Sequence, residues 1–87
     1  MYMNNKLDSK NPGINNTLKY YREKLGVTQR EMEWRTDIGS KHWPHYEAGR
    51  EPKVKLAQKF ARVFNEIATE KNITIKLLTV DDLYPGE

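Results

Sequence analysis

The sequence contains no cysteine among its 87 residues, which excludes a disulfide framework and a thiolate metal site. No apolar run approaches the ~20 residues that a membrane-spanning helix needs, and residues 1–10 contain no apolar stretch of signal-peptide type. We therefore expect a protein of the cytoplasm that does not cross a membrane.

Sequence signatures of catalysis are also absent. The chain has no glycine-rich phosphate loop, no HExxH motif and no obvious catalytic triad. Asp81 and Asp82 are adjacent and point apart on a helical turn, so they form a poor catalytic dyad. His42 and His45 have a spacing that could hold a metal, but no third ligand accompanies them. We expect no enzymatic activity, no metal and no cofactor.

The charges are unevenly distributed along the chain. Residues 1–65 contain 13 Lys and Arg against 7 Asp and Glu, whereas residues 66–87 contain 2 against 5. The basic part suits a polyanionic partner, and the acidic end should face elsewhere. Ordinary solvated surface accounts for the same charges equally well.

Hydrophobic periodicity predicts four or five short helices after a polar arm, residues 1–13. The helical pattern begins at Ile14, Asn15 or Asn16 is the expected N-cap of the first helix, and Gly26 its expected stop. Thr28 opens the second helix and forms a capping box with Glu31.

In the second half of the chain, the sequence predicts a turn, further helices and a short strand. A turn over residues 37–40 leads into a third helix, which begins at Gly39 or Ser40. A fourth helix starts at Val54, and we expect Val54 on its inward apolar face, which extends toward residues 67–68. Residues 73–77 alternate in period two and predict a short strand, and one helical turn follows at residues 80–83.

The central motif is Thr28-Gln29-Arg30-Glu31-Met32, then Ile38, then Tyr46-Glu47-Ala48-Gly49-Arg50 and Pro52. Flanking stretches are Leu18-Lys19-Tyr20-Tyr21-Arg22, Phe60-Ala61-Arg62-Val63-Phe64 and the ending Val80-Asp81-Asp82-Leu83-Tyr84-Pro85. In this order and spacing they resemble the Cro/cI-type (XRE) helix-turn-helix family of transcriptional regulators. The resemblance covers residues 14–65 most closely.

The resemblance implies an all-α, four- to five-helix lambda-repressor-like DNA-binding domain in residues 14–65. Residues 1–13 would be a flexible arm, in which Lys6 and Lys10 could add sequence-independent affinity for DNA. Residues 66–87 would be a short C-terminal extension. A homodimer is expected, either by edge-to-edge pairing of the strand at 73–78 or through the fourth helix, and the alternative is a tail packed on its own domain.

The resemblance also assigns roles to individual residues. The third helix, about residues 40–48, would be the recognition helix in the major groove of an operator. Bases would be contacted by Ser40, Lys41, His42 and His45. Phosphates would be contacted by Gln29, Arg30, Arg50 and Lys53. Arg22 and Glu47 would form a structural ion pair.

Several residues depart from the family pattern. Glu33 stands where a small residue is usual, Thr36 replaces an apolar residue, and Asp37 replaces the turn glycine. Pro44 lies inside the expected recognition helix, which would therefore start late, kink or contain a 3₁₀ turn.

Trp34 should lie on the outer side of the second helix, where it would either fold over a neighbouring helix or form a protein interface. An alternative function follows from these departures: a helix-turn-helix module that binds another protein, or an antitoxin-type partner, in place of DNA.

Overall fold

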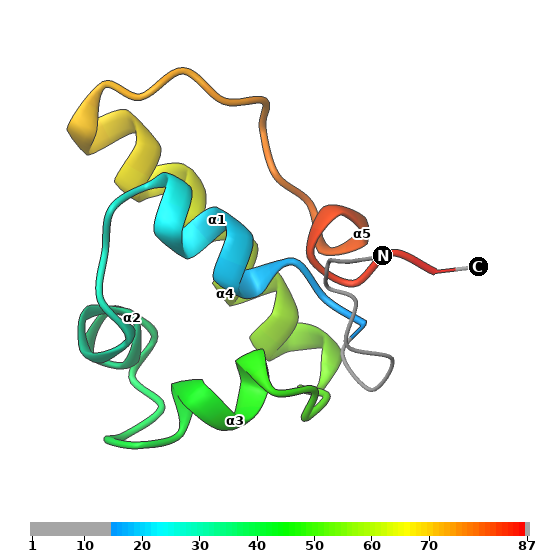
Figure 1. Cartoon of the computed structure of the whole chain (residues 1–87). Helices are drawn as coiled ribbons and strands as arrows, with labels where there is room; N and C mark the ends of the chain where they lie inside the picture. Colours follow the sequence, from blue (N-terminus) through cyan, green and yellow to red (C-terminus); the bar gives the residue numbers. More distant parts are fainter. Residues whose placement is uncertain (1–14, 87) are drawn as a thin grey trace, which may run out of the picture.

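The computed structural model describes residues 15–86; residues 1–14 and 87, with Lys6, Lys10 and Ile14, lie outside the described part. Its helices are α1 (Leu18–Lys24), α2 (Gln29–Thr36), α3 (Trp43–Glu47), α4 (Val54–Lys71) and α5 (Val80–Leu83). The described residues form five helices and no strand, which confirms the predicted all-α fold. Figure 1 shows α1 in front of the long α4, with α2 and α3 below them and α5 at the right.

The core is built on the apolar face of α4. Phe60, Phe64 and Ile67 are fully buried, one helical turn apart. Trp43 of α3 packs edge-on against both phenylalanines, with ring centroids 4.8 and 6.0 Å away. Leu18 of α1 is also fully buried. The first residue of α3 is therefore fixed to the same core as α1 and α4.

Helix α4 runs on through residues 67 and 68, as its periodicity predicts. Val54 is an exception, because it was expected on the inward face and is exposed. It is the first residue of the helix and lies before the point at which α4 meets the core. Lys71, the last residue, donates its Nζ protons to the carbonyls of Leu25 and Gly26 at the end of α1.

The beginning of α1 differs by one residue from the prediction. Thr17 is the N-cap, while the Asn16 side chain accepts a hydrogen bond from the Leu18 N–H at 3.1 Å. The Thr17 N–H donates to the Leu83 carbonyl at 2.9 Å, so α5 docks beside the start of α1. Gly26 follows the end of α1 with φ 71°, the left-handed conformation expected of a helix stop.

At the start of α2, the structure contains one half of the predicted capping box. The Thr28 hydroxyl accepts from the Glu31 N–H at 3.0 Å. The Glu31 carboxylate accepts from Arg35 Nε at 2.9 Å, one turn further along the same helix. The Glu31 carboxylate is thus directed to Arg35 and not back to the N–H of Thr28.

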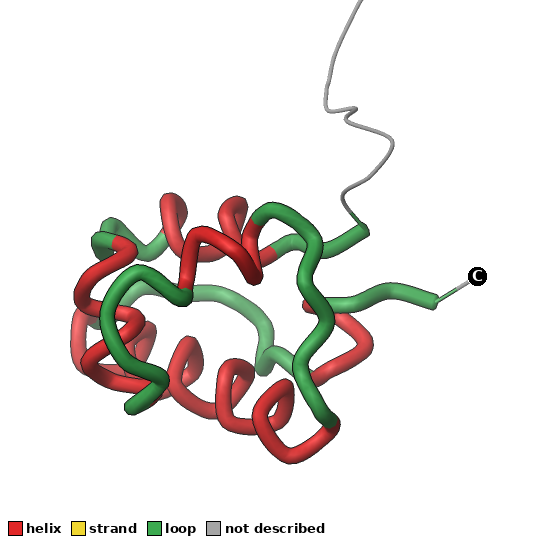
Figure 2. The backbone as a smooth tube through the Cα atoms, turned by 90° about the horizontal axis from the view of Figure 1, so that it is seen from below, coloured by secondary structure: helices red, strands yellow, loops and turns green. Residues whose placement is uncertain are grey.

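The predicted strand at residues 73–77 is wrong. Figure 2 shows only helices and loops in the described residues. Ile73 and Ile75 are half-buried against the core, as the alternation indicates, whereas Leu77, its third apolar residue, is exposed. The Asn65 side chain binds both the N–H and the carbonyl of Leu78, at 2.8 and 3.0 Å. In the described chain the segment is therefore a tail held on its own domain.

Among the described residues, no helix combines the length and the apolar character needed to cross a membrane.

Candidate nucleic-acid interface

The buried carboxylate of Glu47 joins three helices beneath the helix-turn-helix segment. Both its oxygens accept hydrogen bonds from Arg22 of α1, through Nε and Nη2. The Gln29 amide of α2 donates to it at 2.9 Å, and the indole N–H of Trp43 at 2.6 Å. A buried charge is tolerated when it is paired and hydrogen-bonded in this way. The Arg22–Glu47 pair expected from the resemblance is thus present, and it carries two further donors.

A second buried carboxylate, that of Glu33, holds the beginning of α3. Its Oε2 accepts from the Trp43 N–H at 2.9 Å, whereas the residue before the helix, His42, makes no side-chain capping bond. An acidic group at this end of a helix also interacts favourably with the free N–H groups. Glu33 therefore replaces the missing N-cap from the neighbouring helix, a role that the sequence alone did not indicate.

Helix α3 starts later than predicted. It begins at Trp43, so the predicted start at Gly39 or Ser40 is wrong. Of the three outcomes expected from Pro44, a late start, a kink or a 3₁₀ turn, the structure shows the late start. At the second helical position, Pro44 loses no hydrogen bond, because the first N–H groups of a helix have no intrahelical acceptor. A start at Ser40 would have placed the ring against the preceding turn.

The turn between α2 and α3 contains three left-handed residues. Asp37 has φ 60° and Gly39 φ 86°, in agreement with the predicted turn. Lys41 has φ 69°, which is unfavourable by roughly 1–2 kcal/mol for a residue with a Cβ. With Lys41 left-handed, residues 40–42 form a tight turn outside the helix. The expected recognition element is therefore a turn followed by a helix of five residues.

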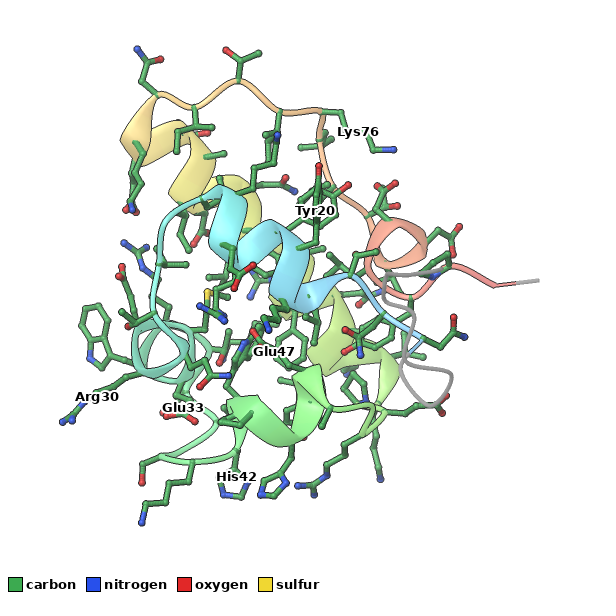
Figure 3. All side chains as sticks on the ribbon, viewed as in Figure 1. Tyr20, Arg30, Glu33, His42, Glu47 and Lys76 are labelled. Carbon is green, nitrogen blue, oxygen red and sulfur yellow. The ribbon has the colours of Figure 1, made fainter. Side chains whose placement is uncertain are left out.

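The expected base-contact residues are all exposed. Ser40, Lys41 and His42 lie in the turn and His45 lies on α3, and all four are exposed. Figure 3 shows the side chains of Arg30 and His42 directed away from the core on the α2–α3 side, while Glu47 lies inside. We call the exposed residues Arg30, Ser40, Lys41, His42, His45, Arg50 and Lys53 the basic face.

Acidic groups of the segment are mostly withdrawn from this surface. Glu33 and Glu47 are buried, and Glu31 is paired with Arg35. Asp37 and Glu51 remain exposed beside the basic face. The surface is therefore more positive than the near-equal charge count of the segment suggests.

Two of the expected phosphate contacts have internal partners. The Gln29 amide is held by Glu47, so it would have to leave that carboxylate to reach a phosphate. The Arg50 guanidinium lies over the ring of Tyr46, 5.2 Å from its centroid, and stays exposed. Lys53 precedes the first residue of α4 and is exposed.

Trp34 is the most exposed of the large apolar residues, at 78%. It borders two shallow hollows, one of about 260 Å³ reaching Arg30 and Ser40, the other of about 390 Å³ reaching Arg35 and Glu66. The side chain thus lies on the outer side of α2 as predicted.

No group of three His, Cys, Asp or Glu side chains within residues 15–86 is placed to hold a metal ion. His42 and His45 are both exposed members of the basic face.

Comparisons with models of known families, with curated proteins and with solved structures find no match to this chain. The case for a function therefore rests on the residues and on the geometry of the basic face.

Proposed function

We propose that this chain is a sequence-specific DNA-binding transcriptional regulator of the Cro/cI type, a cytoplasmic repressor without enzymatic activity. The observation that carries the proposal is the construction of the basic face. An exposed, positively charged turn and helix start are held on two buried carboxylates, Glu33 and Glu47. A rigid support of this kind reduces the ordering cost of binding a ligand as regular as duplex DNA.

Residues 40–45 would enter the major groove. Lys41 would donate to guanine O6 and N7, and Ser40, His42 and His45 would meet neighbouring base edges. Arg30, which borders the same hollow as Ser40, would contact phosphates together with the exposed Arg50 and Lys53, and such contacts set register and orientation. Because α3 is short, the turn contributes as much of the reading surface as the helix does.

Repression would follow from occupation of an operator near a promoter. One element of this size reads few base pairs, so we expect a homodimer on a two-fold site.

Fluorescence anisotropy with labelled DNA from the upstream region of the gene, beside a scrambled duplex, tests the proposal. We expect a preference of ~10³-fold or more for the specific duplex, and an affinity that falls steeply with salt. Lys41→Ala should lose the preference, whereas Lys19→Ala, an exposed lysine of α1, should keep it. Equally weak binding of both duplexes, with tight binding of a protein partner, would contradict the proposal.

Exposed Trp34 favours a second candidate function, a module that binds another protein. Aromatic side chains with this exposure are enriched among residues that anchor protein interfaces. Trp34→Ala tests this candidate: a module that binds another protein should lose that partner. Because Trp34 borders the same hollow as Arg30 and Ser40, the readout that separates the two functions is partner binding and not DNA affinity.

A further inference from the structure

A groove of about 760 Å³ separates α4 from the segment that leads into α5. Its apolar walls include Ala61, Leu78 and Val80. Leu77 lies at its edge with 76% of its surface exposed. A large exposed leucine next to an apolar hollow is an unfavourable arrangement for an isolated surface, and it is the arrangement expected where a partner covers both.

Charges along the same edge of the groove change sign within one helical turn. Arg62 and Glu66 are both exposed, four residues apart on α4. Neither forms an ion pair with another residue of the described part. Lys55 and Lys59 precede this pair on α4, and Glu70, which follows it, is already paired with Arg35 of α2.

We propose that this groove is the contact face for a second copy of this chain, related by a two-fold axis. An antiparallel α4 places Arg62 of each copy against the partner's Glu66, so two equivalent ion pairs form around the axis. Each Leu77 would enter the partner's groove. A two-fold interface requires one surface to complement itself, and the paired charges and the leucine beside a hollow both meet this condition.

The choice of occupant follows from that self-complementarity. A different protein would need its own matching charges and apolar residues, whereas this chain already contains both halves. Association through the groove does not involve the basic face and requires no DNA. Its use in reading a two-fold operator rests on the proposed function.

Sedimentation velocity in the absence of DNA, from low micromolar to near-millimolar protein, tests the interface. We expect a reversible monomer–dimer equilibrium. Arg62→Glu and Glu66→Arg each place like charges in contact twice per dimer and should weaken the dimer by at least about tenfold. The double variant R62E/E66R restores opposite charges across the axis and should restore the dimer.

Two controls make the outcomes separable. Lys19→Glu, with a similar charge change on α1, should leave the dimer unchanged, and circular dichroism melting should show that every variant is folded. Leu77→Ser should weaken the dimer without altering the charge pattern. A wild-type protein that stays monomeric, single variants that dimerise normally, or a double variant that remains monomeric would each overturn the proposal. Specific DNA binding by a monomer would then still stand.

Discussion

Glu47 lies at the meeting point of α1, α2 and α3, and its charge is neutralised by Arg22, its nearest basic neighbour. Both side chains are largely buried, with 13% and 7% of Arg22 and Glu47 exposed. In such a pair the net contribution to stability is small, but the loss of one partner leaves the other charged and unpaired. The pair therefore fixes geometry, and its removal should have a large effect.

Glu47→Ala should destabilise the fold by about 3–5 kcal/mol, because the guanidinium of Arg22 would remain buried without its partner. For a domain of this size, this corresponds to a fall in melting temperature of more than about 10 °C. Thermal denaturation followed by circular dichroism measures it. Glu51→Ala, an exposed acidic residue, is the control and should change stability by less than about 0.5 kcal/mol. An unchanged melting temperature for Glu47→Ala would rule out the structural role.

Lys41 combines an exposed charge with a left-handed backbone that is strained for a residue with a Cβ. Lys41→Gly should relieve the strain and raise the free energy of unfolding by up to about 1 kcal/mol, while DNA affinity falls because the charge is lost. Lys41→Ala should lower affinity without the gain in stability. Denaturant titration and anisotropy separate the two effects. A glycine variant less stable than the alanine variant would show that residue 41 is not left-handed in solution.

At the scale of helices and turns, the sequence predicts local features well. Apolar periodicity and Thr28 account for α1, α2 and α4, and Gly26 correctly marks the end of α1. The two wrong predictions, the strand at residues 73–77 and the start of α3, both concern features that depend on distant residues. Alternation in 73–77 indicates extended chain, but a strand also needs a partner strand, which the described residues do not contain.

The start of α3 also depends on a residue that is distant in the sequence. Pro44 indicated a problem with a start at Ser40, but it could not choose among a late start, a kink and a 3₁₀ turn. That choice depends on Glu33, which reaches Trp43 from another helix. In the sequence, Glu33 stands out only as a large residue where a small one is usual, because sequence spacing does not reveal tertiary capping.

Helix α3 should lose its first turn when Glu33 is replaced. Glu33→Ala removes the acceptor of the Trp43 N–H and should cost about 1–3 kcal/mol. Glu33→Gln retains an acceptor oxygen and should be less destabilising. Amide hydrogen exchange at residues 43 and 45–47 reports the change directly: we expect faster exchange there in the alanine variant than in the wild type, with the exchange of α1 unchanged. Unchanged protection of α3 would mean that Glu33 does not cap it.

The stability of α5 should depend on acid pH through Asp82. Lys76, at 2.7 Å, and the Thr79 N–H hold the pKa of this carboxyl below its ordinary value of 3.8. Because the folded-state pKa is lowered, the stabilisation is complete above the unfolded-state value and is lost as pH falls through the folded-state value.

Melting temperatures of wild type and Asp82→Ala should therefore differ at pH 7 and converge as the pH is lowered below about 4. Asp81→Ala, the exposed neighbouring residue, provides the comparison. A difference that persists undiminished at low pH would show that Asp82 acts through something other than its charge.

For the molecule as a whole, two surfaces have different chemistry. The basic face surrounds the turn before α3, whereas the groove along α4 is apolar with charges of both signs. The sequence predicted where the basic residues cluster, because they are adjacent along the chain. It could not predict the groove, since α4 and residues 77–80 are brought together only by the fold.

The most direct test of the central claim is to map the DNA contacts by NMR. Amide chemical shifts of the isotope-labelled protein would be followed during titration with its specific duplex and with a scrambled duplex. We predict that the specific duplex shifts residues 39–45, together with Arg30, Arg50 and Lys53, and that the scrambled duplex affects fewer of them. Shifts confined to α1 or to the groove along α4, or identical shifts with both duplexes, would contradict the claim that the basic face reads DNA sequence.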